Sequence, residues 1–592
     1  MLKRTLLSIS IASALGTAQA EVVTDGSVGA AMSLSGPDFQ VGAELGQQVG
    51  SNLFHSFTTF NVNTGESATF SGPDTISNVI SRVTGGSASS IDGVLRNTIP
   101  GADLYLLNPA GIMFGPNASL DVQGSLHVST ADVMRFDDGG EFNATLTASS
   151  SFSMASPSAF GFLSDTPAGA GIDGDPNASF ASAFRFRLPA GETFSIVAGD
   201  INMTNSSVPV SGGRVNVAAV SGAGDVTLDA QGLTSSAPAG NVTLTNSTFE
   251  VGGLSGAGNV YISAADFTLD GGDLRSQSLG GSSGVIDVQA TNINLVNGAS
   301  VNTRVRGDGG QGGSINLQAQ ESINISGTDA SGFSVLVASD TFFGDSPGGE
   351  ITLSAADIQV NDGARVSVDT AGDGQGGNIN INASNTLTIT GENSFGEVSN
   401  VAARAASGFS GIGTGNAGSI NIQAGQVQIQ NGAQITTSTL SNGQGGNVSI
   451  MADSLALSGE SSNQVPSVIL SNAVGEGGSL GQGGEIDIQT SQVQLQDGAQ
   501  IASATFGNGD AGAVSINASG TVDISGSSSS GFTSGVFASA SAIPGAAEAS
   551  TLTGQAPGFS IVSRWNDQSF FRTKLRPNRR RRPNRRWWEA QK

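Results

Sequence analysis

The sequence predicts an all-β fold, a right-handed parallel β-helix (solenoid), on three observations. Short apolar runs separated by glycine, asparagine and serine fill most of the 592 residues, of which 85 are glycine. The phrase Gly-Gly-x-(Ile/Val)-x-(Ile/Leu/Val), or a near variant, occurs seven times. Apolar and polar residues then alternate, which is the periodicity of a strand. An array of this kind stabilises a long chain because each unit buries its apolar face on its neighbours.

The spacing of the repeats indicates the size of the unit. The phrase returns at steps of 36, 28, 41, 28, 38 and 28 residues, and it begins at Gly312, Gly348, Gly376, Ala417, Gly445, Gly483 and Ala511. A second marker, Asn/Asp-Gly-Ala, returns at steps of 65, 69 and 66 residues, and it begins at Asn297, Asp362, Asn431 and Asp497. We expect a unit near 66 residues, made of three coils of roughly 22 residues, and about 24 coils in a rod of about 115 Å. A β-propeller would repeat every 40–50 residues with tryptophan or kelch markers, which are missing here.

Composition narrows the classes of function. The formal net charge is −24 at pH 7, so phosphate would be repelled and the main body is not expected to bind nucleic acid. The chain has no cysteine, which fits a protein that crosses an oxidising compartment unfolded. Apolar residues make up 38% of the chain, enough to build a core.

The first twenty residues have the three parts of a signal peptide. Lys3 and Arg4 form a basic start, Leu6–Leu15 is apolar, and Ala18 and Ala20 are the small residues of a cleavage site. No later run reaches the roughly 18 apolar residues that a transmembrane helix needs. We expect residues 1–20 to be removed and the mature chain to leave the inner membrane.

The stretch Asn108–Gly115 organises the region that follows. It reads Asn-Pro-Ala-Gly-Ile-Met-Phe-Gly and lies between two apolar runs. Pro109 presets φ and Gly111 permits a positive φ, so we expect a tight reversal of the chain between two strands. The side-chain amide of Asn108 can cap this turn.

Two features of the surrounding region concern its packing. Phe54, Phe57 and Phe60 recur every third residue among β-branched neighbours, so we expect strand and corner, with the three rings inside the core. Residues 143–189 are rich in alanine, serine and phenylalanine with little periodicity. We expect them to form a loop-rich excursion packed on the first coils.

An ordered set of segments surrounds Asn108 and resembles the secretion domain of filamentous haemagglutinin-like exoproteins, the passengers of two-partner secretion. The family motif Asn-Pro-Asn-Gly-Ile appears as Asn108-Pro109-Ala110-Gly111-Ile112, with alanine in place of the second asparagine. The resemblance covers roughly Glu21–Ile201. The other matching segments are Phe57–Val62, Ile76–Gly86, Ile91–Leu95, Pro100–Tyr105, Asn117–Val122 and His127–Asp132.

The resemblance implies a partner and a destination. It implies that an outer-membrane β-barrel transporter with periplasmic peptide-binding domains accepts the unfolded chain. The residues implied are Asn78, Asn108, Pro109, Gly111 and Ile112. Folding outside the cell, coil by coil, would then draw the rest of the chain through without ATP.

The family's usual activities are adhesion, haemolysis and contact-dependent toxin delivery. No toxin domain is recognisable towards the C-terminus, so the favoured function is a secreted or surface-exposed filamentous adhesin. Its candidate targets are glycans or proteins on a host or neighbouring cell. The alternatives are a polysaccharide-cleaving β-helix enzyme and a truncated carrier of a contact-dependent toxin.

The patterns divide the chain into four parts. After the signal peptide (1–20) come the secretion domain (21–205), the β-helix repeats (206–545) and an atypical basic tail (546–592). All three tryptophans and 11 of the 24 lysines and arginines lie between Arg564 and Lys592. Three interpretations of this tail stay open: a disordered segment, a shift of reading frame after about Ser563, and a basic aromatic segment for an anionic surface.

Residues typical of catalysis are scattered. Polysaccharide-cleaving enzymes need clustered carboxylates, whereas Asp357, Asp362 and Asp369 are spread among expected turns. His55 and His127 have no nucleophile motif beside them, so we expect structural hydrogen bonds from both. We expect no enzyme activity and assign no catalytic residue.

Two glycine-rich segments are candidates for calcium sites. Gly307–Gly312 and Gly372–Gly377 resemble calcium-binding nonapeptides, but the full motif is not kept in tandem. We expect them to form tight corners, and we assign no metal or cofactor.

Overall fold

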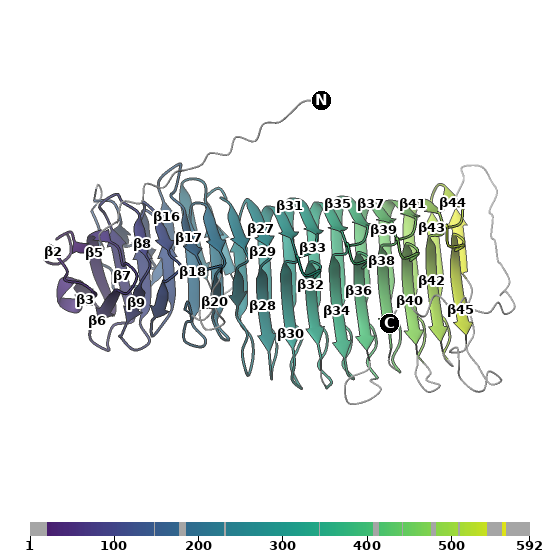
Figure 1. Cartoon of the computed structure of the whole chain (residues 1–592), viewed down its shortest axis with the longest axis horizontal. Coiled ribbons are helices and arrows are strands. Elements are labelled where there is room, and N and C mark those ends of the chain that lie inside the picture. Colours follow the sequence, from purple (N-terminus) through teal and green to yellow (C-terminus); the bar gives the residue numbers. More distant parts are fainter. Residues whose placement is uncertain are drawn as a thin grey trace, which may run out of the picture.

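A computed structural model describes residues 21–146, 149–176, 185–229, 232–342, 344–406, 414–440, 442–474, 481–506, 509–541 and 559–563. The strands lie across the long axis of the molecule and are stacked side by side along it (Figure 1). The predicted parallel β-helix is confirmed, because the strands of successive coils pair in parallel. The predicted signal peptide and most of the tail lie outside the described residues.

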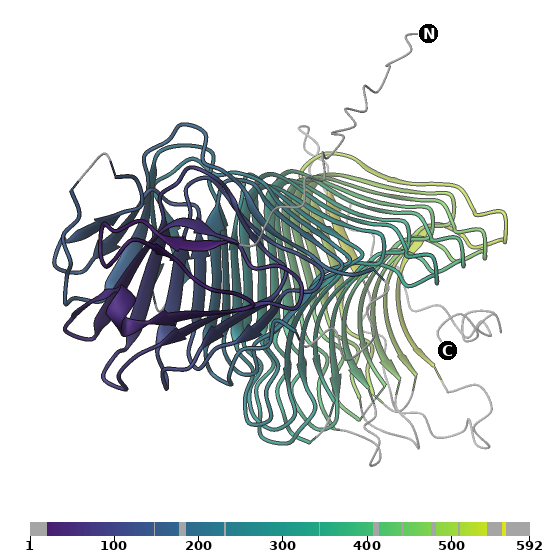
Figure 2. The ribbon, with the colours of Figure 1, turned by 60° about the vertical axis from the view of Figure 1, so that its left-hand side comes forward.

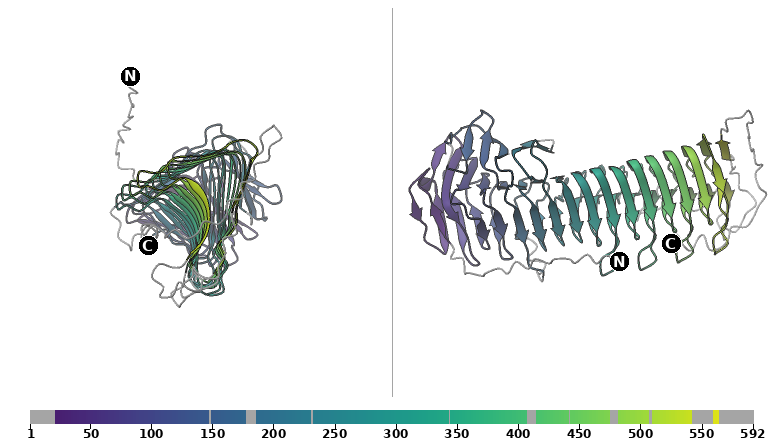
Figure 3. Two further views of the ribbon diagram at one scale, coloured as in Figure 1. Left: turned by 90° about the vertical axis from the view of Figure 1, so that its right-hand side faces the viewer. Right: turned by 90° about the horizontal axis from the view of Figure 1, so that it is seen from above.

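Each coil of the solenoid presents three faces around one core, as the end-on view in Figure 3 shows. Two faces belong to a sheet that has 26 strands within the described ranges. The third face is formed first by a four-stranded sheet and then by an eleven-stranded sheet, counted over the same ranges.

We call the first face column 1; it consists of one strand, or the first half of a long strand, from each coil. Its members are β5 (Asn52–Phe60), β7 (Asn78–Val83), β10 (Asp103–Leu107), β13 (Leu126–Ser129), β18 (Thr193–Ala198), β21 (Arg214–Ala219), β26 (Asn259–Ser263), β29 (Val285–Val296), β31 (Ser314–Ser326), β33 (Glu350–Asn361), β35 (Asn378–Thr390), β37 (Ile420–Gln430), β39 (Val448–Ser458), β41 (Ile486–Gln496), β43 (Val514–Ala518) and β46 (Phe559–Ser563).

Column 2 is formed by short strands in the early coils and by the second halves of β29 to β41 in the later ones. Its separate strands are β8 (Ser89–Ile91), β11 (Ile112–Phe114), β17 (Ala170–Asp173), β19 (Ile201–Thr204), β24 (Val242–Thr245), β27 (Asp266–Asp270) and β44 (Val522–Ile524).

Column 3 completes each coil. Its first sheet contains β3 (Asp38–Gly42), β6 (Ser67–Ser71), β9 (Val94–Asn97) and β12 (Ser119–Asp121). Its second sheet contains β20 (Ser207–Pro209), β25 (Thr248–Glu250), β28 (Asp273–Ser278), β30 (Ser300–Val305), β32 (Leu336–Thr341), β34 (Arg365–Ala371), β36 (Asn400–Ala406), β38 (Gln434–Thr439), β40 (Val468–Val474), β42 (Gln500–Phe506) and β45 (Gly535–Ser541).

The expected coil of about 22 residues is wrong for the array. Ile315 pairs with Ile351, Ile351 with Ile379, and Ile379 with Ile420, so each step of the glycine phrase is one full coil. The 66-residue unit therefore holds two coils, not three. Column 1 has sixteen strands over the described ranges, which corresponds to a rod of about 72 Å rather than 115 Å at ~4.8 Å per strand.

The two coils of a unit differ at one corner. The shorter coil turns through Asn297, Asp362, Asn431 or Asp497, whose φ values lie between 52° and 55°. Asparagine and aspartate tolerate this left-handed conformation better than most residues, which explains the second sequence marker. The longer coil instead projects a small hairpin at the same corner. These hairpins are closed by the bridges Thr328↔Ser334, Glu392↔Val398, Glu460↔Pro466 and Ser527↔Thr533.

An apolar core fills the inside of the coils. Ile379, Ile420 and Ile486 are fully buried, because alternate residues of a strand point to opposite faces and these point inward. Phe57 and Phe60 also lie in this core. Phe54 is buried too, but on the outer side of column 1, so the expectation of one shared core for the three rings is wrong.

A five-stranded antiparallel sheet, here called the cover sheet, packs on the outer side of column 1 in the early coils. Its strands are β14 (Val133–Phe136), β15 (Glu141–Asn143), β16 (Pro157–Phe162), β22 (Gly224–Asp229) and β23 (Gly232–Ser235). Phe142, Phe160 and Val226 of this sheet pack on Phe54 and Leu107 of column 1. The excursion expected for residues 143–189 is thus ordered sheet in part, and the cover sheet also includes residues beyond 205.

In Figure 2 the teal and green coils beyond the early ones repeat regularly.

Short elements close the N-terminal end. β1 (Val22–Thr24) pairs antiparallel with β5 and with β2 (Met32–Ser33), and β4 (Gln47–Val49) also pairs antiparallel with β5. A single 3-10 turn, η1 (Ala43–Leu45), precedes β4. None of the described residues forms a helix long and apolar enough to span a membrane.

The C-terminal boundary of the array lies further along than the sequence patterns placed it. Phe559–Ser563, which those patterns assigned to the tail, forms β46 and pairs in parallel with β43. The tryptophans and the arginine runs lie outside the described residues.

Candidate functional site

The corner at Asn108 joins two columns of the solenoid. Asn108 follows β10 of column 1, and Ile112 begins β11 of column 2. Both strands pair in parallel with the coils before and after them, so the chain turns a corner here and does not reverse between paired strands. The expected tight reversal is therefore wrong, because a solenoid needs only a change of face between successive strands.

Asn108 is fully buried and its side chain satisfies backbone groups on two coils. Its Nδ2 donates to the Ser87 carbonyl and to Ser89 Oγ of the preceding coil, at 3.0 Å each. Its Oδ1 accepts from the Ala110 N–H at 3.0 Å within the corner. The corner thus uses both N–H donors and the acceptor oxygen of a side-chain amide, which explains the expected capping role.

Gly111 and its neighbours complete the corner. Gly111 has a φ of 120°, which confirms the expected positive value. Its N–H donates to the Asn108 carbonyl, and its carbonyl accepts from the Ser89 N–H. A β-carbon added there would lie 3.3 Å from the Gly169 carbonyl oxygen of the following coil. Pro109 is half-buried and Ile112 is buried in the solenoid core.

Asn78 lies at the start of a column 1 strand, whereas Asn108 follows the end of the next one. Asn78 begins β7, where it pairs with Asp103, and Asn108 follows the last residue of β10. The five residues of β10 separate the two positions by about 16 Å at ~3.3 Å per residue. Asn78 Nδ2 donates to Asn52 Oδ1 at 2.8 Å, and Asn52 Nδ2 donates to the Ser153 and Ala155 carbonyls. The structure therefore gives Asn78 a role separate from the Asn108 corner: it supports the segment that leads into the cover sheet.

Arg82 is a residue that the sequence analysis missed. Its guanidinium donates to Ser56 Oγ, Ser27 Oγ and the Asn143 carbonyl, and it lies 4.3 Å from the centre of the Phe142 ring. One buried side chain thus ties β7 to the N-terminal segment and to the cover sheet. The signal in the sequence is an arginine within the apolar run Val79–Val83, a position where a charge needs dedicated partners.

Both histidines are buried, but only one has a hydrogen-bond partner among the described residues. His127 Nδ1 lies 2.9 Å from Ser195 Oγ, and its ring stacks on Tyr105 at 4.4 Å between centres. His55 has no partner for either ring nitrogen within the described residues, so the expected hydrogen bond is wrong for it. Burial lowers the pKa of His55 to about 4 and that of His127 to about 3, so both rings are neutral at pH 7.

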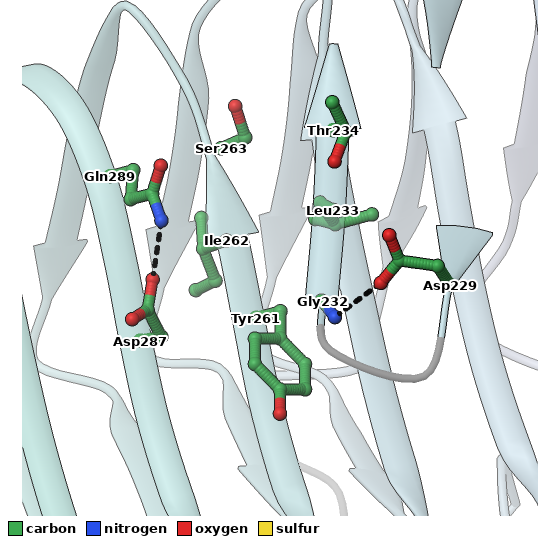
Figure 4. A pocket seen from close by; sticks show the side chains of 9 residues that line it. All are labelled: Asp229, Gly232, Leu233, Thr234, Tyr261, Ile262, Ser263, Asp287 and Gln289. Atoms are coloured by element: carbon green, nitrogen blue, oxygen red, sulfur yellow. Dashed lines mark hydrogen bonds between the residues drawn. The ribbon is translucent and has the colours of Figure 1, made fainter. Parts of the chain in front are cut away.

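Two adjoining cavities lie beside the cover sheet. The inner cavity, of about 200 Å³, is bounded by Tyr105, His127 and Asn216 on column 1 and by residues of β16 and β22. The outer cavity, of about 120 Å³, lies between β23 and the strands β26 and β29, and Asp229 borders both. Figure 4 shows the outer cavity, where Gln289 Nε2 donates to Asp287 Oδ1 at 3.0 Å.

The carboxylates of the array form one notable cluster. Arg304, Asp340, Asp369 and Arg404 lie on the successive strands β30, β32, β34 and β36. The guanidinium of Arg304 forms an ion pair with Asp340 at 3.2 Å. The guanidinium of Arg404 donates two hydrogen bonds of 2.8 Å to Asp369. Asp369 is therefore in a strand and not in a turn. Within the described ranges no three acidic, histidine or cysteine side chains are grouped as a metal site would require.

The fold and its N-terminal region define a class: a parallel β-helix with a closed first coil and a covered outer face. Residues 20–248 match the family model of the TPS secretion domain. Residues 20–248 thus form a secretion domain of the kind that two-partner secretion exoproteins carry. The match runs past residue 205, where the sequence patterns ended the domain, and it includes β22 and β23 of the cover sheet.

Structural comparison also found the secretion domain of HMW1 from Haemophilus influenzae. It is 14% identical, with a TM-score of 0.40 over 74% of this chain and 93% of that one. Curated protein sequences gave no match.

Proposed function

We propose that this exoprotein is a filamentous adhesin and that the Asn108 corner is a residue-level determinant of its secretion. The observation that carries the proposal is the overlap of two findings. The region matched by the secretion-domain model contains the Asn108 corner, and the corner's hydrogen bonds reach the coil before it.

The proposed role of the corner follows from how a solenoid grows. Each coil pairs with the one before it, so the first coils template all later ones. A long rod tolerates the loss of one hydrogen bond worth about 1 kcal/mol, but a nucleus of a few coils is sensitive to it. Asn108, Pro109, Gly111 and Ile112 lie in such a nucleus. Asn78 supports it from the opposite corner through Asn52.

The transporter in this proposal carries periplasmic peptide-binding domains that receive the unfolded chain. Coil-by-coil folding outside the cell then draws the remainder through. The signal peptide of residues 1–20, cleaved after Ala20, delivers the chain to the periplasm, and the folded rod is secreted or stays at the cell surface. Its targets are glycans or proteins of a host or neighbouring cell.

The adhesive role is supported by the shape and surface of the rod. The outward positions of the array are asparagine, glutamine, serine and threonine, and the longer coils repeat an exposed hairpin along one edge. Phe333 and Phe395 in these hairpins are 71% and 64% exposed, and exposed apolar side chains in a row mark contact surfaces.

Co-expression of the full chain with its neighbouring transporter gene tests the proposal. The protein should appear in the medium or on the cell surface only when the transporter is present. Purified secreted protein should then bind cultured cells in a saturable manner. Secretion without the transporter would contradict the export role, and a secreted protein that binds no cell type would contradict the adhesive role.

A further inference from the structure

The inner cavity arises from a change of side-chain size along the outer face of column 1. The outward residues run Ile80, Tyr105, His127, Ser195 and Asn216 on successive strands. The cover sheet lies over all these strands, but the side chains beneath it shrink from aromatic rings to serine and asparagine. The space left under the cover is a cavity of about 200 Å³.

The hydrogen bonds at the cavity floor determine where protons lie. Asn216 Nδ2 donates to Ser195 Oγ at 3.2 Å, and Ser195 Oγ lies 2.9 Å from His127 Nδ1. Ser195 Oγ thus accepts from Asn216, and we assign the arrangement in which it donates its own hydroxyl proton to His127 Nδ1. In that arrangement the single ring proton of the neutral His127 is on Nε2.

Asn216 provides an unused acceptor at this floor. The residue is 1% exposed, and its Oδ1 has no hydrogen-bond partner among the described residues. A buried acceptor without a partner is destabilising, so the site is completed by a group that donates to it. The floor thus offers one acceptor, Asn216 Oδ1, and one donor, His127 Nε2–H.

The remaining walls select the chemistry of the occupant. Met134, Phe160 and Leu228 of the cover sheet supply an apolar wall. The charge of Arg214 is engaged at the border, where its guanidinium lies 4.6 Å from the centre of the Tyr261 ring. A ligand with an apolar face, hydroxyl donors and acceptors and no net charge fits these walls.

We propose that the inner cavity binds one neutral sugar unit, with a ring hydroxyl donating to Asn216 Oδ1 and a sugar oxygen accepting from His127 Nε2–H. The attached glycan leaves through the adjoining outer cavity, where Asp287, Gln289, Ser263 and Thr234 present polar groups (Figure 4). The inference rests on the adhesive function proposed above and assigns it a site.

Saturation-transfer NMR on the full secreted chain tests the site. The probes are galactose, glucose, mannose, N-acetylglucosamine, N-acetylgalactosamine and the anionic N-acetylneuraminic acid. At least one neutral sugar should receive saturation, and N-acetylneuraminic acid should receive none. Asn216→Leu, which keeps the side-chain volume but removes the acceptor, should weaken binding about tenfold or more.

Asn380→Leu is the matched control, because Asn380 is an outward residue of the same column outside the cavity. It should bind the sugar as the unchanged protein does. Failure of every neutral sugar to bind, stronger binding of the anionic sugar, or equal binding by Asn216→Leu would overturn the site. Cell binding by the unchanged chain is measured in parallel. If the chain binds cells but no sugar, only the cavity proposal is wrong. If it binds a sugar but no cells, only the adhesive role is wrong.

Discussion

Asn108 donates its side-chain amide to the carbonyl of Ser87, a residue of the preceding coil that lies 21 positions earlier in the chain. This bond joins a corner of one coil to the corner beneath it. It forms only when the two coils are stacked.

The first prediction concerns this corner. Asn108→Ile removes the donor and acceptor, and Gly111→Val places a β-branched residue at a φ of 120°, at a cost of about 1–3 kcal/mol. Both variants should fail to appear outside the cell and should leave degraded chain in the periplasm, as immunoblots of medium and periplasm will show.

Gly432→Val provides the control for this prediction. Gly432 also has a positive φ, of 86°, and an added β-carbon would lie 2.6 Å from Ser461 Cβ, a tighter contact than at Gly111. It lies in a late coil, so its export should be slowed far less. Normal secretion of both early variants would remove the basis for the corner as a secretion determinant.

Arg82 provides the second prediction. Arg82→Met keeps an apolar stem beside Phe142 but strips the hydrogen bonds to Ser27, Ser56 and the Asn143 carbonyl. The free energy of unfolding of the cover sheet should fall by about 2–4 kcal/mol, because the partners of a buried charge are left unsatisfied. Limited proteolysis should cut the cover sheet faster. Arg275→Met, which breaks a half-exposed pair with Asp273, should change the rate little.

The third prediction is that acid affects the early coils and the middle coils of the rod in opposite directions. His55 and His127 have folded pKa values below the ordinary 6.5, because burial disfavours the charged rings. Their contribution to stability is complete above pH 6.5 and is lost as the pH falls toward 4. Burial, and then the nearby Asp369 carboxylate, raise the pKa of Asp340 from 3.8 to about 6. The contribution of Asp340 to folding stability is complete below about pH 3.8 and is lost as the pH rises through 6.

Hydrogen exchange, corrected for the intrinsic rate, measures both regions in one sample. Between pH 6.5 and 4.5 the coils around β5 and β13 should lose protection, while those around β32 and β34 gain it. Asp340→Asn should abolish the gain in the array and leave the N-terminal loss intact. Equal changes in both regions would show that these groups do not control the response.

The fourth prediction tests the inward and outward faces. Ile420→Ala should lower the free energy of unfolding by about 2–4 kcal/mol, because the side chain is fully buried in the core. Gln423→Ala, three residues further along β37 and exposed, should cost less than about 0.5 kcal/mol. Urea unfolding of the secreted chain compares the two, and similar midpoints would show that the assignment of faces is wrong.

The local sequence pattern was enough to predict many structural features of this molecule. Alternation placed Ile379, Ile420 and Ile486 inward, and the positive φ at Gly111 followed from its place after Asn-Pro-Ala. The corner markers Asn297 and Asp362 were visible in the sequence because only a few residue types tolerate a left-handed backbone. These properties depend on a residue and its near neighbours, so one sequence determined them.

Pairing between coils was decided only by the tertiary structure. The same repeat spacing allows two coils or three in 66 residues, and only the match of Ile315 with Ile351 distinguishes them. Sequence alternation also did not separate Phe54, under the cover sheet, from Phe57, inside the solenoid, since both positions are apolar and buried. The side-chain oxygen of Asn216, which has no partner among the described residues, depends on Ser195 beside it and on the cover sheet above it. Such features come from contacts between residues far apart in the chain, and a local pattern carries no record of those contacts.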